Sequence, residues 1–119
     1  MYPLDEYISF DEMANIYKTS SGLPVNIWVD MGGLYKKGGH GKRIKFQNDY
    51  GNKCNENNTL SMTIEDDPRV ILKQSSRLKI ESSDVELIKK FVIINKVALS
   101  DVADQKIDSI QFAKLMKMI

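Results

Sequence analysis

Basic side chains concentrate in one glycine-rich stretch of the chain, between Met31 and Asn48, where no acidic residue occurs. Five glycines stand in this stretch, at positions 32, 33, 38, 39 and 41. Glycine permits a positive φ, so backbone N–H groups can turn toward one anion, while lysine and arginine add charge. The pattern predicts an anion-binding loop whose candidate contacts are Lys36, Lys37, His40, Lys42, Arg43 and Lys45.

Two aromatic residues close to this loop, Trp28 and Tyr35, offer faces on which a nucleic-acid base can stack. Together with the basic residues they favour an anionic partner, either a nucleic acid or an acidic protein. The alternative is a flexible hairpin whose lysines are only solvated, because runs of charge are commonly solvated surface. The sequence leaves both interpretations open.

The stretch does not match the P-loop of nucleotide-binding proteins. Gly41-Lys42 is followed by Arg43 where a P-loop has serine or threonine, and Lys36 stands where its first glycine is required. The stretch also leads into a strand pattern, whereas a P-loop opens a helix. Nucleotide binding of that kind is therefore not expected.

His40 is the only histidine of the chain. As a general base it would need neighbours that stabilise developing negative charge, and Lys42 and Arg43 stand nearby in the sequence. This combination predicts an alternative function, a metal-independent ribonuclease of the toxin type with His40 as the candidate catalytic residue. The simpler interpretation is a polar loop residue with no catalytic role.

No metal site and no cofactor site are expected. One histidine and one cysteine cannot supply the four ligands of a zinc site. Cys54 lies in a polar segment where nothing marks it as a nucleophile, so it is interpreted as an incidental free thiol. The acids that precede Pro68 fit an ordinary turn.

Alternation of apolar and polar residues predicts four strands. In the first, Val25, Ile27 and Val29 alternate with polar or amphipathic residues, and in the second Ile44 and Phe46 do the same. Short connections favour hairpins, and hence an antiparallel meander. The predicted strands cover residues 23–30, 42–47, 60–64 and 70–72.

Capping patterns predict where the helices begin. The Ser9–Glu12 box precedes a short helix over Phe10–Lys18, and the Ser83–Glu86 box precedes a long helix whose apolar stripe is interrupted at Asn95. The Asp108–Gln111 spacing precedes a terminal helix. The predicted fold is α+β, a small antiparallel sheet of about four strands packed against C-terminal helices, with a short N-terminal helix.

Composition limits the classes of protein that remain. The 119 residues are expected to form one domain, residues 1–119, and 17 basic against 16 acidic residues leave a net charge of +1. Any contact with nucleic acid therefore has to come from a local patch. A single cysteine excludes an internal disulfide, no apolar run of about 18 residues is present, and no signal-peptide pattern opens the chain. A cytoplasmic protein without membrane contact is expected.

The end of the chain is strongly apolar, with Met116, Met118 and Ile119. These residues are interpreted as core of the terminal helix. Alternatively, they leave a patch for a partner or for a second copy of the chain in a homodimer. The second interpretation predicts a structural or accessory protein that self-associates through its helices.

Two segments carry a resemblance to a known group of proteins. They are His40-Gly41-Lys42-Arg43-Ile44-Lys45-Phe46 on a predicted strand and residues 85–92 with Asn95 and Leu99 on a late helix. In these segments the chain resembles small uncharacterised prokaryotic domains of unknown function that are common on mobile elements. Some of them are proposed components of toxin–antitoxin pairs. The resemblance implies a small, prokaryotic, cytosolic protein and supplies no reaction.

Overall fold

A computed structural model describes residues 13–73 and 75–119 of the chain. In this part of the chain a five-stranded antiparallel sheet has the meander order β1-β2-β3-β4-β5. The strands are β1 (Met13–Ile16), β2 (Ile27–Asp30), β3 (Arg43–Gln47), β4 (Thr59–Thr63) and β5 (Val70–Ile71). The α+β class and the meander are confirmed, with one strand more than predicted.

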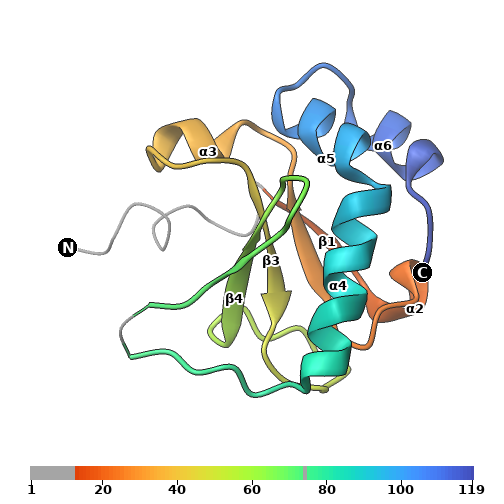
Figure 1. Cartoon of the computed structure of the whole chain (residues 1–119). Coiled ribbons are helices and arrows are strands. Elements are labelled where there is room, and N and C mark those ends of the chain that lie inside the picture. The colour runs from red at the N-terminus through yellow and green to blue at the C-terminus, as the bar shows by residue number, and fades with distance from the viewer. Residues whose placement is uncertain (1–12, 74) are drawn as a thin grey trace.

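Helices cover one face of the sheet. Figure 1 shows α4, α5 and α6 gathered on one side, with the short helix α3 standing apart from α6 and the C-terminus. The helices are α2 (Lys18–Ser21), α3 (Leu34–Lys37), α4 (Ser82–Ile94), α5 (Lys96–Ala103) and α6 (Ser109–Leu115). The molecule is thus a two-layer arrangement of a sheet and C-terminal helices, as the pattern predicts.

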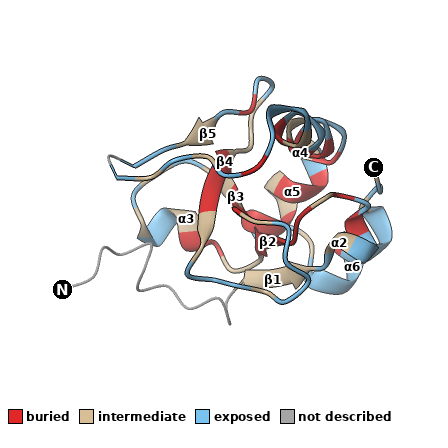
Figure 2. Ribbon diagram, turned by 90° about the horizontal axis from the view of Figure 1, so that it is seen from below, coloured by how far each residue is buried: buried red, intermediate tan, exposed pale blue. Residues whose placement is uncertain are grey.

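Strand alternation separates the two faces of the sheet. Ile27 and Val29 of β2 point into the hydrophobic core beside Ile44 and Phe46 of β3, and the core is closed by residues of α4 and α5. Figure 2 shows this buried layer running along the strands and the inner faces of those helices. The residues between them, such as Trp28, lie on the face away from the helices because side chains alternate along a strand.

Strand β1 corrects the prediction for the N-terminal part of the chain. The spacing of apolar residues predicts a helix over Phe10–Lys18, but Met13–Ile16 pair with β2 instead. A helix this short is marginal by itself, so pairing with a neighbouring strand overrides the local preference. Among the described residues the first helix is α2, which begins only at Lys18. The Ser9–Glu12 capping box lies outside the described residues.

Two of the three helix signals predicted for the C-terminal part of the chain are confirmed. A capping box at Asp108 and Gln111 opens α6, and the break at Asn95 separates α4 from α5. The Ser83–Glu86 capping box is wrong, because α4 already begins at Ser82 with Glu81 as the N-cap residue and no side-chain cap. Ser83 therefore lies inside the first turn, where its hydroxyl cannot cap the helix.

The end of the chain packs back onto the domain. Met116 and Ile119 are partly buried against the core, and the Ile119 amide donates to the Ser21 carbonyl at 2.9 Å. Asn95 holds the same segment, since its side chain bonds both the amide and the carbonyl of Lys117. Within residues 13–73 and 75–119, no helix is both long and apolar enough to cross a membrane.

Candidate anion-binding loop

The loop between β2 and β3, residues 31–42, is here called the basic loop. Its first turn is organised by Asp30, the last residue of β2, which is 3% exposed. One carboxylate oxygen accepts the amides of Gly32 and Leu34 at 3.0 and 3.1 Å, and the other accepts the Tyr35 amide at 3.1 Å. Asp30 thereby takes up donors at the start of α3, in the manner of a helix cap.

The remaining amides of the basic loop are also used within it. Those of Gly38, Gly39 and His40 donate to carbonyls of residues 34, 36 and 35 at 3.2 to 3.3 Å. The glycines do supply the left-handed backbone that the turn needs, with φ of 73° at Gly33 and 67° at Gly39. The expectation that the loop amides converge on an external anion is not met by those of Gly32, Leu34 and Tyr35, because the anion they surround is the chain's own Asp30.

Four side chains fasten the basic loop to α5, and they are here called the anchor cluster: Tyr35, Lys42, Ser100 and Asp104. The Asp104 carboxylate forms an ion pair with the Lys42 ammonium and accepts the Tyr35 hydroxyl at 2.5 Å. Lys42 also donates to the Ser100 hydroxyl at 2.6 Å. The basic loop is therefore bonded to the rest of the domain at both ends.

The electrostatics of the anchor cluster follow from these contacts. Hydrogen bonds from Lys42 and Tyr35 lower the pKa of Asp104, and the positive charges of Lys42 and Lys36 lower it further. The hydrogen bond from the Tyr35 hydroxyl to Asp104 raises the pKa of Tyr35, and desolvation of the hydroxyl raises it further. Asp104 is thus ionised and Tyr35 protonated at neutral pH, the pair of states in which the bond between them is strongest.

The six predicted anion contacts fall into three groups, and the first two belong to α3 and to the end of the basic loop. Lys36 and Lys37 are exposed at the end of α3, whereas the Lys42 ammonium is already bound to Asp104. Both Lys36 and Lys42 lie against the Tyr35 ring, with their ammonium groups 5.8 and 5.7 Å from its centroid. Of the six predicted contacts, Lys42 therefore acts inside the protein and not at its surface.

The two predicted stacking residues do not offer an open aromatic face. Trp28 is 3% exposed, and it lies on the face of β2 opposite the core that α4 and α5 cover. Tyr35 is half-buried, and its ring is flanked by lysine ammonium groups while its hydroxyl is bound to Asp104. The prediction that these residues stack on a base therefore loses its structural support.

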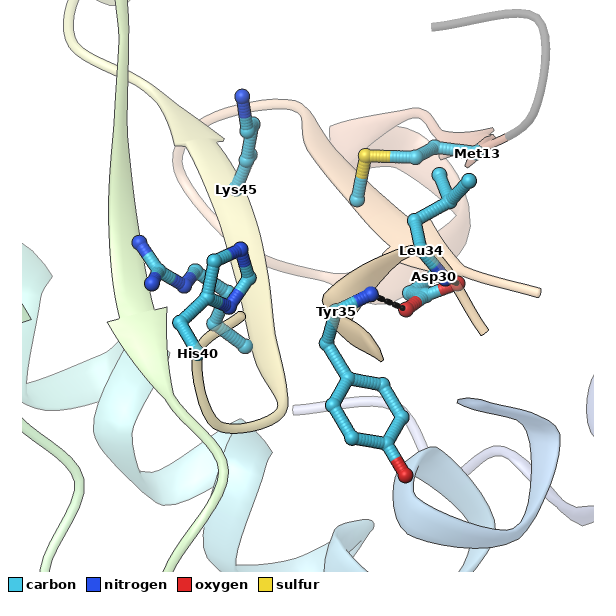
Figure 3. A pocket seen from close by; sticks show the side chains of 7 residues that line it. Met13, Asp30, Leu34, Tyr35, His40 and Lys45 are labelled. Atoms are coloured by element: carbon cyan, nitrogen blue, oxygen red, sulfur yellow. Dashed lines mark hydrogen bonds between the residues drawn. The ribbon is translucent and has the colours of Figure 1, made fainter. Parts of the chain in front are cut away.

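Three further predicted contacts, His40, Arg43 and Lys45, line a shallow hollow next to α3. Figure 3 shows His40 facing Met13, Leu34 and Asp30 across this hollow, while the Tyr35 ring points away from it toward the C-terminal helices. The His40 ring is 2.7 Å from the Gly41 carbonyl through Nδ1 and packs against Gly38. The hollow thus joins the cationic side chains of Arg43 and Lys45 and the His40 ring to apolar side chains of β1 and α3.

The three residues of the ribonuclease alternative do not converge. His40 and Arg43 line the hollow, but the Lys42 ammonium is held away by Asp104 and Ser100. Lys42 is therefore directed toward α5 and is not among the side chains that line the hollow. RNA cleavage that is abolished by His40→Ala would reinstate this alternative.

Sequence reasoning missed Asp30, Ser100 and Asp104. For Asp30 a signal was present, because an aspartate at the end of a strand followed by two glycines fits a side chain that accepts nearby amides. For Asp104 there was no signal, since it contacts Lys42 across 62 positions of sequence.

The remaining polar candidates do not form a metal centre. The described residues contain no group of three or more histidine, cysteine, aspartate or glutamate side chains arranged to hold a metal ion. Cys54 is half-buried and its sulfur accepts the Asn15 side-chain amide at 2.7 Å, a contact between the Asn-rich segment and β1.

Searches with this chain against family models, curated proteins and solved structures gave no match.

Proposed function

We propose that this protein is a small binding domain that contacts an anionic partner through the basic loop. The observation that supports the proposal is a fixed loop with two exposed lysines, Lys36 and Lys37, beside a hollow lined by further cations. A loop that is already ordered loses little conformational entropy when it binds, which favours recognition. The proposed place of action is the cytosol.

Charge balance in the loop supports the same proposal. Residues 31–48 contain no acid, and two carboxylates that contact this stretch are each engaged by the loop itself. Asp30 accepts backbone amides, and Asp104 is paired with Lys42. The cations at the surface of the loop are therefore left to attract a partner, with an interaction that salt screens.

The test measures binding of two polyanions, polyglutamate and a single-stranded DNA oligonucleotide, at two salt concentrations. Binding to at least one is expected at low salt, and the double variant Lys36→Gln with Lys37→Gln should weaken it strongly. For DNA, each lysine removed should lower the salt slope by about one.

The matched control removes two lysines elsewhere, Lys114→Gln with Lys117→Gln. They lie in or just after α6, on the side of the molecule away from α3 in both views (Figures 1 and 2). This variant carries the same net charge as the test variant and should bind as the wild type does. Equal weakening by both variants, or no binding of either polyanion at low salt, would contradict the proposed function.

A second candidate function, self-association through the helices, is favoured by exposed apolar residues on the helical layer. Val97 is 74% exposed and Ile110 66% exposed, and Ile93, Leu115 and Met118 are also more than half exposed. Sedimentation velocity over a range of concentrations tests it. A dimer that Val97→Glu converts to a folded monomer would support self-association, and a wild-type protein that stays monomeric would exclude it.

A further inference from the structure

Residues 109–119, which are α6 and the segment after it, are here called the C-terminal arm. Figure 1 shows α6 beside α5 and the end of the arm next to α2. Within α6 only Phe112 is buried, at 1% exposed, and the other six residues are exposed. Beyond α6, Met116 and Ile119 are partly buried against the core. The arm is therefore joined to the domain by few side chains.

The end of the arm is held by its backbone. Asn95, between α4 and α5, is 2% exposed; its side chain donates to the Lys117 carbonyl at 2.9 Å and accepts the Lys117 amide at 2.7 Å. The Ser21 carbonyl accepts the Ile119 amide at 2.9 Å. Release of the arm would break these bonds and expose Phe112 to water, which is costly. A domain that releases its arm is therefore stabilised when another arm takes the same place.

The hinge that precedes the arm, residues 104–108, contains a strained residue. Gln105 has a φ of 60°, and among the described residues it is the one residue other than glycine with a positive φ. The Gln105 amide donates to the Val102 carbonyl at 3.2 Å, and the next amide donates to the Asp101 carbonyl at 2.8 Å. A helix that ends with this pair of bonds usually has glycine at the position of Gln105. The Cβ of glutamine makes the left-handed conformation unfavourable, so opening the hinge relieves strain.

We infer that two copies of the chain exchange their C-terminal arms, so that each arm docks on the other copy. The contacts of the arm are then all made again, with Phe112 in the core and Asn95 bonded to the backbone of the exchanged arm. The closed monomer and the exchanged dimer differ in the hinges and in the entropy lost on association, and relief of strain at two hinges favours the dimer. This inference rests on self-association, the second candidate function, and specifies its form.

The arm itself shows why the occupant is a second copy. It changes from helix to extended backbone at Met116, which has a φ of −62° and a ψ of 131°. Phe112 on the helical part enters the core, and Met116 and Ile119 on the extended part pack against it. A second copy supplies a segment with this same change of conformation and this same spacing of apolar side chains.

The experiment measures the monomer–dimer equilibrium of the full-length chain by sedimentation velocity after incubation over a range of concentrations. A reducing agent is present, so that no dimer is linked through Cys54. The wild-type protein is expected to form a dimer at high concentration. After dilution this dimer should dissociate slowly, because each arm has to leave the other copy before it can return to its own.

Two substitutions at Gln105 separate backbone strain from side-chain contacts. Gln105→Gly removes the Cβ that opposes a positive φ, so it should stabilise the closed hinge. Because a dimer contains two hinges, the dimerisation constant should fall about ten- to thirty-fold. Gln105→Ala is the matched control, since it removes the same amide group but keeps the Cβ, and it should dimerise as the wild type does. Glycine is the usual residue at such a helix end, so the glycine variant is expected to fold.

The outcomes separate the exchange of arms from self-association in general. Equal dimerisation of the glycine and alanine variants, or a dimer that dissociates at once on dilution, overturns the exchange but leaves self-association through exposed apolar residues in place. A wild-type protein that stays monomeric at every concentration overturns both. The dilution of the wild-type dimer needs no variant, so it tests the inference independently of the substitutions.

Discussion

Two polar loops leave β3 at its opposite ends, and they are held in place in different ways. The basic loop precedes the strand, and the Asn-rich loop, residues 48–58, follows it. In the Asn-rich loop the ordering residue is Gln47, which is fully buried. Its amide donates to Asp49 at 2.6 Å and to the Gly51 and Lys53 carbonyls at 3.3 and 3.2 Å. This loop is therefore stabilised by its own neighbours in sequence and also by the bonds that Asn48 and Tyr50 make with residues 77–84.

The basic loop is held mainly by two carboxylates. Asp30 accepts its amides from the preceding strand, and Asp104 of α5 binds Tyr35 and Lys42. Both loops therefore depend on the last residue of the preceding strand and on contacts with more distant elements, but the Asn-rich loop is held largely through amide and hydroxyl groups, whereas the basic loop is held through carboxylates and keeps Lys36 and Lys37 at the surface. Order and available charge coexist there because the residues that fix the loop are not the residues that would bind a partner.

The largest expected effect is on the Asn-rich loop. Gln47→Ala removes the buried amide and leaves several backbone groups without partners, which should lower the free energy of unfolding by about 2–4 kcal/mol. Chemical denaturation measures the change. Asn57→Ala, at an exposed position of the same loop, is the control and should change stability by less than about 0.5 kcal/mol. If Gln47→Ala changed the free energy of unfolding as little as Asn57→Ala does, the order of the loop would not depend on the Gln47 side chain.

The corresponding change in the basic loop is Asp30→Ala. Three amides at the start of α3 lose their acceptor, so the free energy of unfolding should fall by about 1–3 kcal/mol. Hydrogen exchange at residues 34–38 should accelerate more than exchange elsewhere. Asp30→Asn, which keeps one oxygen acceptor, should lower the free energy of unfolding by less. An equal loss of stability in the asparagine and alanine variants would mean that the charge of Asp30, and not its hydrogen bonding, organises the turn.

Asp104→Asn tests the anchor at the other end of the basic loop. It should weaken the bonds to Tyr35 and Lys42 and speed hydrogen exchange in the loop, with little effect on the Asn-rich loop. Because the pKa of Asp104 is lowered in the folded protein, its stabilising contribution is present at neutral pH and is lost as pH falls below about 4. Thermal unfolding of both proteins from pH 7 to pH 3 should show their difference shrinking toward the acid end.

The smallest effect on stability is expected for Lys36→Gln combined with Lys37→Gln. Both side chains are exposed, so the free energy of unfolding should change by less than about 0.5 kcal/mol while polyanion binding is lost. Denaturation curves and binding titrations on the same sample measure both. A clear loss of stability would mean that these lysines, like Lys42, belong to the internal structure of the loop.

Local signals in the sequence predicted those features that depend on neighbouring residues. The Asp108–Gln111 capping box forms as the spacing indicates, with bonds of 2.8 and 2.9 Å. The interruption at Asn95 is a real break between α4 and α5. The Ser83–Glu86 box failed although its spacing was equally good, because α4 begins two residues earlier than the box requires. A capping pattern therefore predicts a helix end more reliably than it predicts the cap itself.

The sequence by itself determined the meander of β2 to β5 and the position of the basic loop. The reason is that the alternation of apolar and polar residues, the short connections and the charge runs all depend only on residues adjacent in sequence. Only the tertiary structure decided that Met13–Ile16 are a strand, that Trp28 is buried, and that Lys42 is bound by Asp104. The physical reason is that strand pairing and ion pairing join residues far apart in the chain. Which of several equivalent lysines remains available to a partner depends on where a distant carboxylate comes to lie after folding.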